Sequence, residues 1–301
     1  MRPGKAGLLA AVLLGAAACG GVPEPTPAAV VRAVVAIEPQ ADWVSRIGER
    51  HVAVTVLVAP GQEPEMYEPT PRQMTEVAEA AVLFTMGLPF EAGLAARIRA
   101  SAPVLKVVDL LSGIERLPMP GGHHHHGHGH SHRHAAGEPD PHVWLDPVRV
   151  RAMAATIRDA LAEVAPEHSE DFRAGHDAFV DRLAAADQLC REMLAPFAGR
   201  EMLVFHPAFG YFAHRYGLIQ VPIEVSGREP TPRELAATVE RSRSTGSRTV
   251  FVQPESASGA ARTVAEAIGG RVVVLNPLAA DTAGNLKEMG RTVAEIFQEE
   301  T

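Results

Sequence analysis

Short runs of apolar, mostly β-branched residues alternate with helical segments in both halves of this chain of 301 residues. Each run is apolar on both faces, as expected of a strand in a parallel sheet that helices cover on both sides. The pattern therefore predicts an α/β fold with two parallel sheets, each flanked by helices. The runs lie at 30–37, 52–58, 81–85 and 104–108 in the first half, and at 202–205, 221–225, 249–252 and 272–275 in the second.

Residues 147–195, between the two halves, contain no such run and are rich in alanine, leucine and charged residues. Pro166 divides this stretch into two helices, because proline interrupts the hydrogen bonds of a helix interior. The second helix, about 167–195, would be ~43 Å long at ~1.5 Å per residue. That length suffices to run along both sheets, so we expect two lobes joined by one long helix, with a cleft between the lobes.

Two further helices are well marked in the second half. One begins after Thr231, with Glu234 three residues later, which is the arrangement of a capping box. The other closes the chain with an apolar stripe at helical spacing. The stripe consists of Leu286, Met289, Val293, Ile296 and Phe297.

The N-terminus has the features of an export signal. Arg2 and Lys5 precede an apolar run at 6–18, which is shorter than the ~20 residues of a membrane-spanning helix. Small residues then lead to Cys19, as at the processing site of a bacterial lipoprotein; an ordinary cleaved signal is the alternative. We therefore expect a signal peptide at 1–19, lipidation of Cys19 at the membrane surface, and a proline-rich tether at 20–29.

The formal net charge of −8 argues against nucleic acid as a partner and suits an exported protein that handles cations. Cys190 is the only cysteine besides Cys19, and we expect it to be a buried free thiol. A metal site in this chain must then be built from histidine and carboxylate side chains. We expect a monomer, located in the periplasm or at the cell surface.

The stretch 121–134, GGHHHHGHGHSHRH, holds eight of the 14 histidines. Glycine and serine between them cannot build a core, so we expect a solvated loop. Neutral imidazole is a strong ligand of Zn²⁺ and neighbouring transition metals. The loop is therefore predicted to capture metal, with a solubilising linker as the alternative. Its histidines are His123, His124, His125, His126, His128, His130, His132 and His134.

Four potential metal ligands follow predicted strands or lie in loops, where open α/β sheets bind their ligands. Glu65 follows the second predicted strand, His206 the fifth and Asp281 the eighth. His142 lies in the segment DPHVWLDP, just before the central helices. Two imidazoles and two carboxylates can hold Zn²⁺, and they also suit Mn²⁺.

Each candidate has a simpler alternative. Glu65 competes with Glu63 and Glu68 in the same segment, and any of the three can be solvated. Asp281 can instead cap the last helix, since aspartate is favoured at that position. Three further histidines show no pattern beyond that of surface residues: His51, His168 and His176.

Seven segments form a specific combination in chain order. They are PGQEPEMYEPTP (60–71), the histidine-rich loop, DPHVWLDP (140–147), FHPAFGYFAHRYGL (205–218), IEVSGREPTP (223–232), FVQPE (251–255) and NPLAAD (276–281). In these segments the chain resembles the substrate-binding lipoproteins of bacterial zinc and manganese ABC transporters, the cluster A-I (cluster 9) family. The resemblance implies two lobes bridged by a long helix, with one metal ion in the cleft. It also implies that His142, His206 and Asp281 are metal ligands.

The first ligand position departs from the family pattern. Zinc-type members usually carry histidine where this chain has Glu65. Manganese-type members keep that histidine and carry glutamate where this chain has His206. Three arrangements stay open: Glu65 binds through oxygen, a water completes a three-ligand site, or a histidine of the 121–134 loop does so. The two histidines and the histidine-rich loop favour Zn²⁺, with Mn²⁺ or iron as the alternative.

The resemblance implies a binding protein, not an enzyme, that captures Zn²⁺ outside the cytoplasmic membrane and hands it to an ABC permease for import. Two alternatives come from other classes. One is a metal buffer or adhesin that works without a permease. The other is a zinc hydrolase, although the sequence contains no HExxH motif.

The expected boundaries are 30–165 for the N-terminal lobe, 166–196 for the linker helix and 197–301 for the C-terminal lobe. Glu224 and Arg228 fall in a segment expected to line the cleft or to contact the permease. Because protons compete with metal for histidine, binding should weaken below pH ~6.5, the ordinary histidine pKa.

Overall fold

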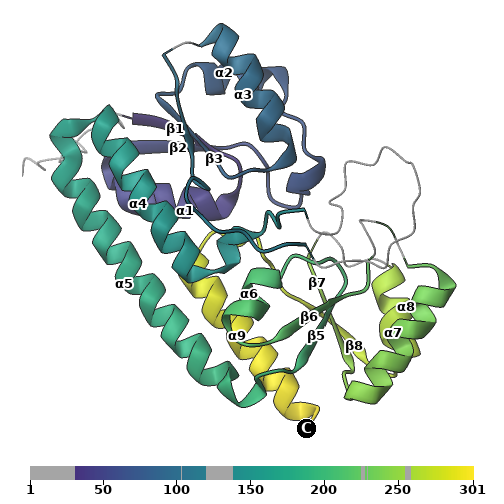
Figure 1. The fold of residues 1–301 in the computed structure, drawn as a ribbon. Coiled ribbons are helices and arrows are strands. Elements are labelled where there is room, and N and C mark those ends of the chain that lie inside the picture. Colours follow the sequence, from purple (N-terminus) through teal and green to yellow (C-terminus); the bar gives the residue numbers. More distant parts are fainter. Residues whose placement is uncertain (1–30, 103, 120–137, 225–227, 229, 255–258) are drawn as a thin grey trace, which may run out of the picture.

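The computed structural model describes residues 31–102, 104–119, 138–224, 228, 230–254 and 259–301 (Figure 1). The predicted signal peptide, the tether and the histidine-rich loop lie outside these residues, as does Cys19. Among the described residues, none of the helices combines the length and apolar character that crossing a membrane requires.

The first sheet contains four parallel strands in the order β2-β1-β3-β4. All four were predicted from the apolar runs. Helices α1, α2 and α3 connect them, and α2 begins with a capping box between Thr70 and Gln73. The strands are β1 (Val31–Val35), β2 (Val52–Val56), β3 (Val82–Thr85) and β4 (Lys106–Asp109), and the helices are α1 (Glu38–Gly48), α2 (Pro71–Ala78) and α3 (Pro89–Ser101).

The second sheet repeats this topology, with four parallel strands in the order β6-β5-β7-β8. Strand β6 of this sheet lies earlier in the chain than the predicted 221–225, because its pairing with β5 already begins between Glu201 and Ile219. The strands are β5 (Glu201–Val204), β6 (Ile219–Pro222), β7 (Thr249–Val252) and β8 (Arg271–Val274), and the helices are α6 (Gly210–Arg215), α7 (Pro232–Thr245) and α8 (Gly259–Ala267).

Long helices join the two sheets along one side of the molecule (Figure 1). Helix α4 (Pro147–Val164) ends before the short turn η4 (Pro166–His168), and α5 (Ser169–Leu194) then runs back past both sheets. The closing helix α9 (Thr282–Glu299) lies beside α5. These bounds confirm the interruption at Pro166, the long connecting helix and the amphipathic closing helix. The short turn η5 (Ala195–Phe197) follows α5.

One continuous apolar core extends from the first sheet to the second along the long helices. It includes Trp43 of α1, Phe172 of α5 and Phe297 of α9, all of them buried. Two smaller cores lie on the other faces of the sheets, one against α2 and α3 and one against α7 and α8. Because the shared core crosses both halves, apolar burial fixes the two sheets relative to each other.

The close approach of α5 to α1 gives a stability prediction. A Cβ on Gly175 would lie 2.7 Å from the carbonyl oxygens of Arg46 and Ile47, and backbone atoms cannot move aside cheaply. Gly175→Ala should therefore lower the free energy of unfolding by ~1–3 kcal/mol, as overpacking does. Urea denaturation measures this change. The control is Gly93→Ala on α3, where nothing lies within 4 Å; it should be neutral or stabilise by up to ~1 kcal/mol.

Candidate metal centre

Three predicted ligands converge between the two sheets. The Oε1 atom of Glu65 lies 3.3 Å from the Nε2 atom of His142 and 3.3 Å from the Nε2 atom of His206. One ligand atom of each residue lies within 4.8 Å of those of the other two. Glu65 and His142 belong to the first half of the chain, while His206 follows β5 in the second. The group therefore spans the two halves.

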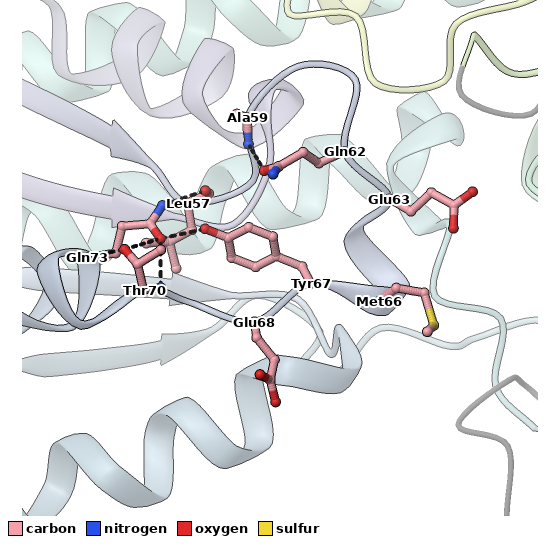
Figure 2. A pocket seen from close by; sticks show the side chains of 9 residues that line it. All are labelled: Leu57, Ala59, Gln62, Glu63, Met66, Tyr67, Glu68, Thr70 and Gln73. Carbon is pink, nitrogen blue, oxygen red and sulfur yellow. Dashed lines mark hydrogen bonds between the residues drawn. The ribbon is translucent and has the colours of Figure 1, made fainter.

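Hydrogen bonds through Gln73 tie the segment of Glu65 to Leu57, the residue that follows β2. Tyr67 donates a hydrogen bond from its hydroxyl to Gln73 at 2.6 Å, and the Gln73 amide donates to the carbonyl of Leu57 at 2.8 Å (Figure 2). Within the segment, the short turn η2 (Pro64–Met66) carries Glu65. Its acidic neighbours Glu63 and Glu68 are exposed and line an open pocket of about 630 Å³ that does not include Glu65. Of the three glutamates, Glu65 is the one that meets both histidines.

His142 is fixed by a buried carboxylate. Asp140 is 1% exposed, and its Oδ1 atom lies 2.8 Å from His142 Nδ1 and also accepts a hydrogen bond from the His142 backbone at 2.9 Å. The second half of the chain holds the same segment, since the hydroxyl of Tyr211 donates to the carbonyl of Asp140. Downstream, Trp144 in the turn η3 (Val143–Leu145) donates from its indole to the carbonyl of Pro277 at 2.8 Å. These contacts leave Nε2 as the His142 atom that faces Glu65.

His206 has a matching partner. Its Nδ1 atom lies 2.8 Å from the Oε2 atom of Glu224, so its Nε2 atom is again the one near Glu65. The two residues meet because β5 and β6 run parallel with Val204 opposite Pro222, which places positions two residues further on side by side. A carboxylate behind each imidazole fixes the ring orientation and makes the free nitrogen a better metal ligand.

The donor set suits a zinc-type ion. Two imidazole nitrogens and one carboxylate oxygen are typical ligands of Zn²⁺, which binds them at ~2.0–2.2 Å in a tetrahedral shell. Neighbouring ligand atoms in such a shell lie ~3.3 Å apart, which matches the two distances measured from Glu65 to the histidines. A water or a fourth side chain would complete the shell.

Hydrogen bonding outweighs burial in setting the charge of this group. Burial by itself opposes the ionised form of Glu65, but hydrogen bonds from His142 and His206 lower its pKa well below the ordinary value. Burial likewise disfavours protonated His206, yet its bonds to Glu224 and Glu65 raise its pKa to about 10. The pKa of His142 is also raised, by Asp140 and Glu65 against the effect of burial. In the metal-free site, hydrogen bonds from the two histidines to the Glu65 carboxylate therefore hold the group together.

These shifts predict that metal binding tightens with pH well above 6.5. The metal must displace a proton from Nε2 of a histidine whose pKa is raised, so protons compete throughout the neutral range and up to about 10 for His206. Each proton released strengthens binding by about tenfold per pH unit. Calorimetric titration in buffers of different ionisation enthalpy measures the number released. Affinity that stays constant between pH 6.5 and 8 would contradict this prediction.

Glu224, which contacts His206 Nδ1, should contribute to Zn²⁺ affinity without binding the ion itself. Glu224→Gln keeps the shape of the side chain but removes the charge that orients the imidazole and raises its basicity, so Zn²⁺ affinity should fall by about 10–100-fold. Competition titration against a chelator measures the loss. Glu63→Gln, which changes an exposed glutamate of the neighbouring loop, should bind as the unchanged protein does. Equal affinities of the Glu224 and Glu63 variants would refute the role of Glu224.

The structure does not bring Asp281 to this group, which corrects the prediction that it is a ligand. Asp281 is the N-cap of α9, where it accepts a hydrogen bond from the backbone of Gly284 at 3.1 Å. Its carboxylate also lies 2.6 Å from Arg182 and 3.6 Å from Arg46. Two cations and the start of a helix already use its oxygens, so the capping alternative describes this residue. Against the effect of partial burial, the backbone hydrogen bond from Gly284 and the Arg182 guanidinium lower the pKa of Asp281.

The end of β8 carries Asn276 instead. This residue comes two positions after β8, as His206 comes two positions after β5. With Ala279 and Ala280 it lines a pocket of about 300 Å³ that Ile37 and Val58 of the first half close from the other side. The Asn276 side chain accepts a hydrogen bond from the backbone of Leu278. Asp281 lies five residues further along the chain. Asn276, not Asp281, therefore has the same spacing from its strand as His206 has from β5.

Together, two parallel sheets flanked by helices, a long connecting helix and a histidine–carboxylate group between the sheets match the architecture expected of the cluster A-I substrate-binding lipoproteins. The family model of the zinc-uptake complex component A, periplasmic (ZnuA), matches residues 33–299. The chain belongs to this family.

Solved structures and curated proteins agree with this assignment. A crystal structure of ZnuA has a TM-score of 0.79 and 33% identity, covering 88% of this chain and 98% of that chain. A zinc-bound deletion mutant of ZnuA gives a TM-score of 0.79 and 34% identity, covering 88% of this chain and 97% of that chain. The zinc-binding protein AdcA of Streptococcus pyogenes serotype M3 is 27% identical over 270 residues, which cover 85% of this chain and 52% of AdcA. The chain thus spans about half the length of the curated AdcA relatives it matches.

Proposed function

We propose that this chain captures Zn²⁺ with high affinity outside the cytoplasmic membrane and delivers it to an ABC permease for import. The observation that carries the proposal is the Glu65–His142–His206 group, whose nearest ligand atoms are 3.3 Å apart. Membership of the ZnuA family, the zinc-binding AdcA relatives and the zinc-bound ZnuA structure support zinc as the cargo. Binding is reversible coordination, with protons exchanged for metal and no covalent turnover.

The proposal includes the parts of the chain outside the described residues. Cys19 would carry the lipid that anchors a monomeric protein at the membrane surface. A relative with 27% identity, AdcA of Streptococcus pneumoniae, is named a zinc-binding lipoprotein. The eight histidines between His123 and His134 would collect metal near the cleft. They should bind it more weakly, because ordering a loop of this composition costs conformational entropy.

One observation favours a second cargo, Mn²⁺. The carboxylate of Glu65 stands at the centre of the group, and oxygen ligands suit Mn²⁺ better than imidazole does. Two imidazoles nevertheless favour Zn²⁺, which binds such sites more tightly than Mn²⁺ in the usual affinity order.

Competition titrations with Zn²⁺ and Mn²⁺ on the purified protein test the proposal. One tight Zn²⁺ site is expected, which His142→Ala removes and His176→Ala leaves intact. Zinc uptake by cells that lack the protein should then recover with the unchanged chain and not with His142→Ala. Absence of tight Zn²⁺ binding would overturn the proposal. Tight binding with unchanged uptake would leave a metal buffer or adhesin instead.

A further inference from the structure

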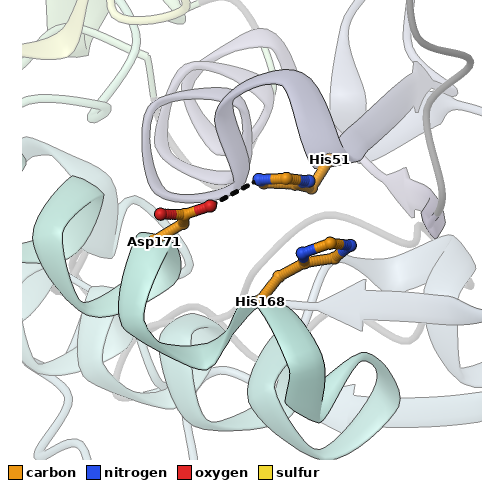
Figure 3. Close-up of side chains that lie close together, drawn as sticks. All are labelled: His51, His168 and Asp171. Atoms are coloured by element: carbon orange, nitrogen blue, oxygen red, sulfur yellow. Dashed lines mark hydrogen bonds and ion pairs between the residues drawn. The ribbon is translucent and has the colours of Figure 1, made fainter.

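A second histidine–carboxylate group lies outside the candidate metal centre, where the end of α1 meets the start of the long helix. His51 closes the turn η1 (Glu49–His51), which follows α1; His168 closes η4, and Asp171 lies in the first turn of α5 (Figure 3). One nitrogen of each histidine and one oxygen of Asp171 lie within 4.8 Å of one another. Among the described residues, this group and the candidate metal centre are the two that meet this criterion.

The surroundings hold these side chains together. His51 is 8% exposed, and its Nε2 atom lies 2.7 Å from the Oδ2 atom of Asp171. The ring of His168 stacks on that of His51, with centroids 3.8 Å apart and an angle of 19° between the planes. Phe172 contacts both rings edge-on, at 6.0 Å and 6.2 Å. A largely buried imidazole therefore faces a carboxylate, and a second imidazole lies directly beside it.

We propose that His51, His168 and Asp171 bind a second divalent transition-metal ion of the Zn²⁺ class, with water completing the shell. Two nitrogens and one oxygen are a complete set of protein ligands for an open zinc site. To admit the ion, the 2.7 Å contact between His51 and Asp171 opens to ~3.3 Å, the spacing of ligands in a tetrahedral zinc shell. The His168 ring also tilts out of the stack, since a metal ion lies in the plane of each imidazole that binds it.

The local charges should make the affinity of this second site for a metal ion lower than that of the candidate metal centre. Arg50 lies 3.4 Å from the same Asp171 oxygen, and the positive end of α5 is close by. Both repel a cation, and Arg50 competes directly for the carboxylate. We therefore expect the ion to bind after the candidate metal centre has filled. When bound, it ties the end of α1 to the start of α5, so it should stabilise the fold at high Zn²⁺ concentration.

The test compares variants of the whole purified protein with Zn²⁺ as the probe. At saturation the unchanged protein should bind one more ion than His168→Ala or His51→Ala. The matched control is His176→Ala, because His176 faces Asp177 on the same helix at 2.9 Å but belongs to no such three-residue group; it should bind as many ions as the unchanged protein. The histidines of the 121–134 loop are present in every variant and cancel in the comparison.

Two further readouts locate the ion and exclude a folding artefact. Crystals soaked in Zn²⁺ should show an anomalous peak between the three side chains, and Arg50→Gln should tighten the second site several-fold. The extra rise in melting temperature at high Zn²⁺ should disappear in His168→Ala while circular dichroism stays unchanged. Equal stoichiometry in all variants, with no peak at this position, would overturn the proposal and leave Zn²⁺ binding at the candidate metal centre unaffected.

Discussion

His206→Ala should weaken tight Zn²⁺ binding by more than about 100-fold. Removing a group that only orients a ligand costs about 10–100-fold, so removing the ligand itself should cost more. The change also strips Glu224 of the imidazole it contacts at 2.8 Å, which leaves a carboxylate near the site without that hydrogen bond. Glu65 and His142 would then be the only members of the group left to hold the ion.

Competition against a chelator of known affinity measures this loss, with His214→Ala as the control. His214 lies on α6, in the same FHPAFGYFAHRYGL segment, but its side chain is exposed. The control should bind Zn²⁺ within about twofold of the unchanged protein. If His206→Ala stayed within tenfold, His206 would be no ligand, and the group between the sheets would have another role.

Glu65→Gln should also reduce Zn²⁺ affinity by about 100-fold. The substitution preserves the shape of the side chain but exchanges an anionic oxygen for a neutral amide, which is a weaker ligand for a divalent cation. It further removes the charge that both imidazoles face at 3.3 Å. The same titration measures the loss, with Asp281→Asn as the matched carboxylate control, expected to change affinity by less than about twofold.

A second substitution at this position separates geometry from charge. Glu65→His supplies a third imidazole and should keep Zn²⁺ binding while lowering the affinity for Mn²⁺, since imidazole favours zinc. A silent Glu65→Gln with unchanged affinity would indicate a site of two histidines and water. Loss of binding in Asp281→Asn would show that Asp281 is a metal ligand.

Most secondary structure could be predicted because its causes are local. Apolar runs predicted all eight strands, although β6 lies earlier than expected, and the apolar stripe from Leu286 to Phe297 predicted the closing helix. Pro166 marked the break before α5 because a proline disrupts helical hydrogen bonds wherever the helix lies. His142 and His206 were predicted as ligands because their segments resemble those of a known family, since a single histidine in a loop is a weak signal.

The partners of these residues could not be read from the chain in the same way. Glu224 lies 18 residues from His206, and the two meet because β5 and β6 pair in one particular register. Asp140 was visible in the DPHVWLDP motif, yet its role depends on the buried pocket in which the Asp140 and His142 side chains face each other. His51 and Asp171 are 120 residues apart in sequence, and only the packing of α1 against α5 joins them.

The sequence by itself thus determined the two parallel sheets and the long helix that joins them, because the periodicity of apolar residues encodes these elements directly. The two histidines of the candidate metal centre were predicted from the resemblance of their segments to a known family. Only the tertiary structure decided which carboxylate faces both histidines. Glu65 turns inward on η2, whereas Asp281 caps α9 and is held by Arg182. The reason is that the role of a carboxylate depends on which charged side chains from distant parts of the sequence fold against it. The order of residues along the chain does not give the distances between such side chains.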